Sequence, residues 1–228
     1  LIFDKASLGS KIEVIEIPEE FRDEAASWRH RLLEQIASLD DAVLATYLDT
    51  EDISAADIHR VLRSATIANQ IQPVFCGASL NYAGVQPVLD AICNYLPSPL
   101  ERPPVQGINP NAKRGGQDVQ TRKPSAKEPF SGLIFKIQSD QHGDLCFVRV
   151  YSGELKSRSR PLNPRTGKKE MVSQLYQIQA DNRERIETDS VEAGDIVGVM
   201  GPKDSVTGDT LCDAQHAILL ESITFPET

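Results

Sequence analysis

Residues 131–152 read SGLIFKIQSDQHGDLCFVRVYS, and this stretch decides the fold of the C-terminal half of the chain. Apolar residues recur at every second position in 133–138 and again in 145–150, which is the period of a half-buried β-strand. His142-Gly143 between the two runs is a turn signal. The stretch therefore predicts two strands separated by a turn.

Turn signals continue at regular intervals after this stretch. They are Ser152-Gly153, Thr166-Gly167, Gly194-Asp195 and Thr207-Gly208. Short β-rich runs punctuated in this way are typical of a small all-β barrel rather than of strands that alternate with helices. We therefore expect a β-barrel over residues 128–228.

The residues before the predicted barrel follow another pattern. Pro73-Val74-Phe75-Cys76 is short and apolar and is followed by Gly77, which favours a buried strand. A helix is then predicted up to Pro97, with a stripe of apolar side chains at helical spacing. The stripe consists of Val85, Val88, Leu89, Ile92 and Leu96, and Cys93 is expected in the core beside it. A strand, a loop and a helix in this order indicate an α/β architecture for residues 71–100.

Residues 1–70 are predicted to be mainly helical after a short strand in 11–17. Apolar residues recur at steps of three or four from Phe21 to Tyr47, and core packing is the interpretation of Trp28 and Tyr47. The Asp40-Asp41 pair is expected to divide this helix in two. Ser54 begins a capping box that predicts the start of a further helix.

Proline, glycine and positive charge are concentrated in 101–127, which predicts a linker between two domains. Within it, residues 109–126 lack any apolar period and are expected to be the most mobile internal segment. The fold class predicted from the whole sequence is α+β with several domains.

The composition of the 228 residues, 40% hydrophobic and 25% charged, is that of a globular protein of one or two domains. No apolar run approaches the roughly 18–20 residues that cross a bilayer. The four cysteines include no close pair, which favours free thiols in a reducing compartment and a cytoplasmic location. Because the chain begins with Leu1 rather than methionine, we expect an internal piece of a longer protein.

Charge is unevenly distributed. The net charge is −9, and residues 1–96 alone contain 7 basic and 15 acidic residues. This balance argues against a face that binds duplex DNA. A local basic cluster lies in the predicted barrel and consists of Arg158, Arg160, Arg165, Lys168 and Lys169. It could contact RNA phosphates, or it could be a solvated hairpin.

The sequence contains no motif for nucleotide phosphate chemistry. It has neither a glycine-rich phosphate loop with Lys and Ser or Thr, nor Asn-Lys-x-Asp, nor Gly-x-Gly-x-x-Gly. No nucleophile and base are placed for hydrolysis, so no catalytic residue is assigned. Asp213 and His216 are three residues apart, but no further His or Cys has partner spacing, so no metal site is assigned.

Several longer motifs carry a resemblance to a known family. They are Pro73 to Leu80, Gly84 to Asp90, Tyr95 to Leu100, Arg149 to Leu155 and Thr207 to Asp213. In these motifs the chain resembles bacterial elongation factor G, the GTPase that drives translocation on the ribosome. The resemblance implies a GTPase-domain insert subdomain in 1–70, the last strand and helix of that domain in 71–100, the linker in 101–127 and a translation-factor β-barrel in 128–228.

The resemblance also implies a nucleotide contact at Gly77, Ala78, Ser79 and Leu80. The family usually has Gly-Ser-Ala-Leu here, and the backbone N–H of its alanine contacts the guanine carbonyl. In this chain Ser79 inherits that backbone position, because Ala and Ser are exchanged. This exchange departs from the family's usual sequence, and so does Arg158-Ser159-Arg160, where the family commonly has a glycine. Both departures would fit a divergent paralogue.

For the longer protein, the resemblance implies GTP or GDP and Mg²⁺ as cofactors. It implies the ribosome as partner, a monomer, no membrane or DNA, and GTP-dependent movement of tRNA and mRNA during elongation. This chain alone is expected to bind no cofactor and to hydrolyse no GTP. The alternatives are a related ribosome-protection or peptide-release GTPase, and a non-enzymatic module whose acidic helices bind protein and whose barrel binds RNA.

Overall fold

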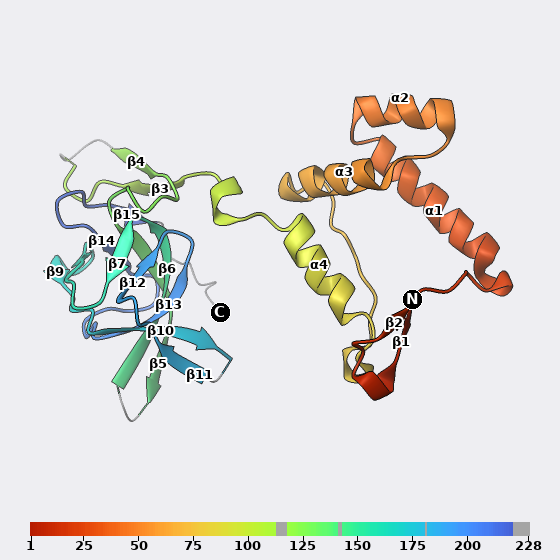
Figure 1. The fold of residues 1–228 in the computed structure, drawn as a ribbon. Coiled ribbons are helices and arrows are strands. Elements are labelled where there is room, and N and C mark those ends of the chain that lie inside the picture. The colour runs from red at the N-terminus through yellow and green to blue at the C-terminus, as the bar shows by residue number, and fades with distance from the viewer. Residues whose placement is uncertain (113–117, 141–142, 181, 221–228) are drawn as a thin grey trace, which may run out of the picture. The chain divides into compact units, whose positions relative to one another are not determined.

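The computed structural model describes residues 1–112, 118–140, 143–180 and 182–220 (Figure 1). The chain forms two compact units, Leu1–Pro97 and Ser98–Thr228, and combines helices with several antiparallel sheets. No helix in the described ranges is long and apolar enough to cross a membrane.

The first unit is built on helices α1 (Arg22–Ala37), α2 (Asp41–Thr50), α3 (Ala55–Ile67) and α4 (Val85–Tyr95). Two short strands, β1 (Ile2–Phe3) and β2 (Ile12–Glu13), pair before them. The strand expected over 11–17 is therefore shorter than predicted. Single helical turns occur at η1 (Lys5–Ser7), η2 (Glu19–Phe21) and η3 (Ser79–Asn81).

Two capping interactions set the helix boundaries that the sequence predicts. The Asp40 carboxylate accepts the N–H of Val43 at 3.0 Å, so α2 begins anew after α1 ends. The Ser54 hydroxyl accepts the N–H of Asp57 at 3.1 Å and starts α3. The predicted division at Asp40-Asp41 and the predicted cap at Ser54 are both confirmed.

The helical core occupies only the C-terminal half of α1. Leu33, Ile36 and Ala37 are buried there together with Val43 and Val61. Trp28 is 61% exposed, so its predicted place in the core is wrong. The apolar spacing is right for a helix, but only the last turns of α1 lie against α2 and α3, as Figure 1 shows.

The predicted strand at Pro73–Cys76 does not form. No described strand pairs with this segment, and Val74 is 88% exposed. A strand needs hydrogen-bonding neighbours, and the described residues supply none here. α4 forms as predicted and ends before Pro97, but its apolar stripe is exposed: Val85, Val88, Leu89, Ile92 and Leu96. Cys93 is exposed as well, which corrects its expected place in the core.

The second unit is a β-domain preceded by the turn η4 (Pro99–Glu101). Its strands are β3 (Val105–Ile108), β4 (Val119–Arg122), β5 (Ser131–Asp140), β6 (Gly143–Ser152), β7 (Glu154–Lys156), β8 (Leu162–Asn163), β9 (Lys168–Lys169), β10 (Gln174–Gln179), β11 (Asn182–Arg185), β12 (Ser190–Glu192), β13 (Ile196–Met200), β14 (Thr210–Cys212) and β15 (Leu219–Leu220).

The central hairpin is the stretch that opened the sequence analysis. β5 and β6 pair antiparallel, with Ile134 opposite Val148 and Ile137 opposite Cys146. They lie within an eight-stranded sheet in the order β11-β10-β13-β6-β5-β14-β8-β9. The two predicted strands are confirmed.

One buried cluster fills the interior of the β-domain. Its members come from seven strands and from the loops between them: Phe130, Ile134, Cys146, Val148, Val150, Leu155, Val172, Leu175, Val191, Val197, Val199 and Leu211. Strands of two sheets thus contribute to one buried cluster, as expected of the predicted β-barrel architecture.

The segment expected to be a linker is largely part of the β-domain. β3 and β4 pair with one another, and β15 pairs with β3, which gives a three-stranded sheet. Val105 packs against the buried cluster around Cys212 and Ile218. β3 pairs with β4 nearby and with β15 about a hundred residues later, so local sequence alone does not indicate the whole sheet. Residues 113–117 of the segment predicted to be mobile lie outside the described residues.

Candidate functional site

The first predicted site is the loop that precedes α4. Its two ends are joined by a bridge in which the Ala78 N–H donates to the Ala83 carbonyl at 2.9 Å and the Ala83 N–H donates back at 3.2 Å. Between these residues, η3 is closed by the N–H of Asn81, which donates to the Ala78 carbonyl at 2.8 Å. The loop is therefore a turn closed by backbone hydrogen bonds.

The outward edge of this turn presents main-chain donors. Ser79 and Leu80 are the first two residues of η3, and the first N–H groups of any helix lack an intrahelical acceptor. Leu80 is 92% exposed. On its other side the loop borders an open cavity of about 250 Å³, whose lining includes Gly77, Ser79 and Val88. The loop can therefore offer backbone N–H groups to a planar acceptor.

A segment far away in the sequence supports the loop. The Lys5 ammonium donates to the Asn81 side-chain carbonyl at 3.1 Å, and the Gln86 amide donates to the Gly9 carbonyl at 2.7 Å. Sequence reasoning missed these supporting residues. Each pair is more than seventy residues apart, so no local spacing could have indicated it.

The second predicted site is the basic cluster around β8 and β9, and the structure divides it. The Arg165 guanidinium forms two charged hydrogen bonds with the Asp209 carboxylate, from Nε at 2.6 Å and from Nη2 at 2.8 Å. The Lys168 ammonium lies 2.7 Å from the Asp204 carboxylate. These two cations are neutralised within the domain.

The acceptor of Arg165 is a buried carboxylate. The side chain of Asp209 is 3% exposed and also accepts hydrogen bonds from the Asn163 amide at 2.8 Å and from the Val206 N–H at 2.9 Å. Burial raises the pKa of Asp209, but these three donors outweigh it and hold the pKa below its ordinary value. Arg165 thus holds the loop before β14 in place.

The other three basic residues remain exposed. Arg158, Arg160 and Lys169 have no acidic partner among the described residues. Arg160 and Lys169 border an open depression of about 450 Å³, which also has Glu154 and Asp213 in its lining. This remnant of the cluster is the part that could contact a phosphate.

The remaining candidates have structural explanations. Asp213 and His216 bind one another, with Nδ1 3.0 Å from the carboxylate, and the described residues contain no group of three potential metal ligands. Cys146 and Cys212 are buried, and burial raises the pKa of Cys146 to about 11. Neither thiol is reactive in this state.

Comparison with known proteins identifies the β-domain first. Residues 129–214 match the family model described as elongation factor G domain 2, which defines this unit as a β-barrel domain of a translation factor.

The similarity to elongation factor G extends over the whole chain. The chain is 46% identical over 229 residues to elongation factor G of Amoebophilus asiaticus and 44% identical to elongation factor G of Salinibacter ruber. Both alignments cover 100% of this chain and 32% of the relative, so the chain spans about a third of the length of these proteins.

A solved structure shows the same fold. A crystal structure from Thermus thermophilus matches 93% of this chain and 29% of its own, with a TM-score of 0.67 and 23% identity.

Proposed function

We propose that this chain is part of a ribosomal translocation GTPase, which moves tRNA and mRNA during elongation. The observation that carries the proposal is the unbroken similarity of the whole chain to proteins named elongation factor G. The non-enzymatic alternative has no comparable support, because the similarity covers both units and is not confined to the barrel.

The similarity to elongation factor G supports the domain assignment that we propose. Residues 1–70 are the insert subdomain, 71–100 the last strand and helix of a GTPase domain, and 128–228 the second domain. The linker reduces to the chain around Pro97, because β3 and β4 belong to the β-domain.

The exposed apolar face of α4 supports the assignment to a GTPase domain. Leu89 is 56% exposed, Ile92 48% and Leu96 54%, and they lie on one face at helical spacing. Val74 and Phe75 before the loop are exposed too. In a parallel sheet, such apolar surfaces of a strand and a helix are normally covered by the neighbouring strands and helices. The described residues contain no such neighbours for α4 and the segment before the loop. The remainder of the GTPase domain would cover them.

Within this assignment, the loop Gly77-Ala78-Ser79-Leu80 contacts the guanine base. The geometry fits this role, because Ser79 begins η3 and its N–H faces no intrahelical acceptor. A main-chain donor does not depend on the side chain, so the exchange of Ala and Ser leaves it intact. The described residues include no cluster suited to Mg²⁺, and the sequence has no phosphate loop. We propose that this chain contributes to recognition of the base, and we expect it to hydrolyse no GTP alone because its sequence has no phosphate loop.

The guanine contact is tested by substituting Ser79 in the full-length protein. Ser79→Pro removes the N–H at a first helical position, where proline is sterically accepted, and should weaken GDP binding about tenfold, as expected for about 1.4 kcal/mol. Ser79→Ala keeps the N–H and should bind GDP as the parent does. Equal loss in both variants would show that the hydroxyl, and not the backbone, makes the contact.

Ribosomal RNA is the partner we propose for the exposed cations of the barrel. Arg160 and Lys169 lie together at the edge of one depression, whereas Arg165 and Lys168 are already paired. Arg160→Ala should weaken ribosome binding and reduce its salt dependence. Lys123→Ala, which removes an exposed charge outside this cluster, should leave both unchanged.

Ribosome-stimulated GTP hydrolysis tests the function as a whole. The full-length protein should hydrolyse GTP faster with ribosomes, and the isolated chain should show no turnover above buffer. Turnover by the isolated chain would contradict the proposed division of labour. A full-length protein without turnover would favour an interaction module.

A further inference from the structure

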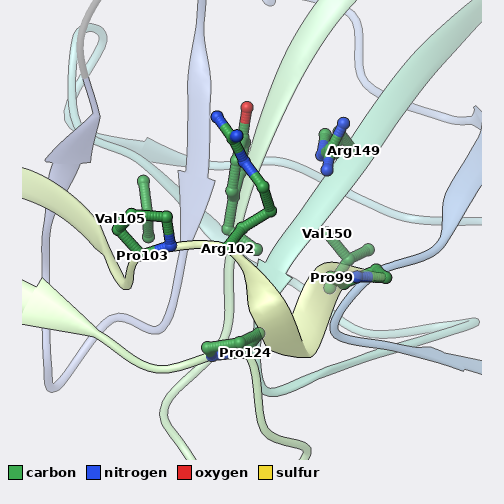
Figure 2. A pocket seen from close by; sticks show the side chains of 9 residues that line it. Pro99, Arg102, Pro103, Val105, Pro124, Arg149 and Val150 are labelled. Atoms are coloured by element: carbon green, nitrogen blue, oxygen red, sulfur yellow. The ribbon is translucent and has the colours of Figure 1, made fainter. Parts of the chain in front are cut away.

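A pocket in the β-domain contains two arginines that no carboxylate among the described residues neutralises. It has a volume of about 330 Å³ and lies between the turn η4 and strand β6 (Figure 2). Arg102 and Arg149 line it together with Tyr151, and proline and valine side chains form much of the remaining lining. None of the predicted sites includes these residues.

The lining of the pocket includes a close contact at a turn. Gly194 has a φ of +106°, and a Cβ there would lie 2.9 Å from Cγ of Pro99. Pro99 can therefore rest directly on the turn before β13. Glu101 stabilises the same segment, because its carboxylate accepts the N–H of Ser98 at 2.8 Å. The segment that contains Arg102 is thus fixed over β6.

Arg149 has an unsatisfied donor inside the domain. Its Nε is buried and has no hydrogen-bond partner among the described residues, and its guanidinium lies over the Tyr151 ring at 5.3 Å from the centroid. A guanidinium stacked on a ring still directs its N–H groups outward in its own plane. No ion pair forms at Arg149 or Arg102 among the described residues.

The geometry points to a site for the carboxylate side chain of an acidic protein segment. A carboxylate is planar and can accept hydrogen bonds from both terminal amino groups of one arginine together. Figure 2 shows Arg102 and Arg149 on the same side of the pocket, above Pro99 and Pro124. The apolar lining by Val105, Val150 and the prolines suits the residues that flank such a side chain better than an RNA backbone. This site is independent of the proposed nucleotide contact.

The side-chain Nε–Hε resonance of Arg149 reports on this site directly. We would titrate the full chain with the acetylated, amidated peptide Val-Glu-Val, with Val-Gln-Val as the uncharged match and with inorganic phosphate as a second anion. The Glu peptide should shift this resonance in a saturable way, with about tenfold higher affinity than the Gln peptide. Inorganic phosphate should bind more weakly than the Glu peptide.

Variants separate recognition from charge. Arg149→Lys keeps the charge but loses the planar pair of donors, and should weaken the Glu peptide about tenfold. Arg102→Ala, at an exposed position, should also weaken it without changing the fold, and Arg158→Ala outside the pocket should have no effect. Equal binding of both peptides, tighter binding of phosphate, or no saturable shift would each overturn the proposal.

Discussion

Asp209 shows how one residue organises a surface loop of the β-domain. Its buried carboxylate accepts hydrogen bonds from Arg165, Asn163 and the backbone of Val206. The loop before β14 and the hairpin of β8 and β9 therefore share one acceptor. Arg165 was predicted as an RNA contact from its charge alone, but its partner lies 44 residues away, so spacing could not indicate its structural role.

Asp209→Asn should destabilise the protein by about 2 kcal/mol at pH 7. Removing one member of a fully buried ion pair destabilises a protein by more than this value. The Arg165 side chain is half exposed, so water can solvate its charge in the variant and the loss is smaller. The folded pKa of Asp209 lies below the unfolded value of about 3.9, so its stabilisation is present above that pH and is lost as the pH falls through the folded pKa. Urea unfolding should give a lower free energy of unfolding for the variant than for the parent at pH 7, and this difference should become smaller in acid. An equal difference in the free energy of unfolding at both pH values would contradict a stabilising role of the ionised Asp209 carboxylate.

Two glycines with the same φ of +70° provide a matched test of close packing. A Cβ at Gly153 would lie 2.5 Å from the Phe130 nitrogen, whereas a Cβ at Gly167 would meet nothing within 4 Å. Gly167→Ala should cost only about 1 kcal/mol of backbone strain. Gly153→Ala should cost at least about 2 kcal/mol more, because the backbone at 128–130 must move. Similar unfolding midpoints in urea for the two variants would show that the packing is looser than described.

At the scale of elements, local patterns predicted those structures that need no distant partner. The alternation in 131–152 predicted β5 and β6, and the Asp40 and Ser54 caps predicted the starts of α2 and α3. The segment 73–76 forms no strand among the described residues, and much of 101–127 forms strands instead of a linker, for a common reason. Whether an extended segment becomes a strand depends on neighbours that lie elsewhere in the sequence.

Ser54→Ala should destabilise α3 by about 1 kcal/mol, because one of its first N–H groups loses its acceptor. Amide hydrogen exchange within α3 should accelerate accordingly. Thr46→Ala provides the control, since its hydroxyl only donates to the Ala42 carbonyl within α2, and exchange in α3 should stay unchanged. Equal exchange rates in parent and Ser54→Ala would show that the cap contributes nothing to α3.

At the scale of the whole molecule, the four cysteines distinguish exposed from buried surfaces. Cys76 and Cys93 are exposed, while Cys146 and Cys212 are buried and have raised pKa values. Under native conditions a thiol reagent such as Ellman's should modify two thiols rapidly and two only on unfolding. In the full-length protein we expect Cys93 to react more slowly, because the proposed remainder of the GTPase domain would cover α4. Rapid reaction of all four thiols in the isolated chain would contradict the buried core of the β-domain.

The sequence alone could indicate the family and the barrel. It could not show which residues of each candidate site are bound to other parts of the chain and which remain exposed. The loop Gly77 to Leu80 forms a defined turn, yet its support by Lys5 and Gln86 depends on contacts across the unit. The five basic residues near β8 and β9 separate into paired and exposed cations only when Asp204 and Asp209 are placed. The arginine pocket needs both η4 and β6, which no motif connects.

We propose that this chain is part of a ribosomal GTPase whose binding to the ribosome depends on the nucleotide. Co-sedimentation with ribosomes tests this proposal most directly. The full-length protein would be sedimented with ribosomes in a non-hydrolysable GTP analogue and in GDP, beside the isolated chain. We predict strong binding of the full-length protein with the analogue, weak binding with GDP, and little binding of the isolated chain in either. Binding that does not depend on the nucleotide, or no binding at all, would contradict the claim.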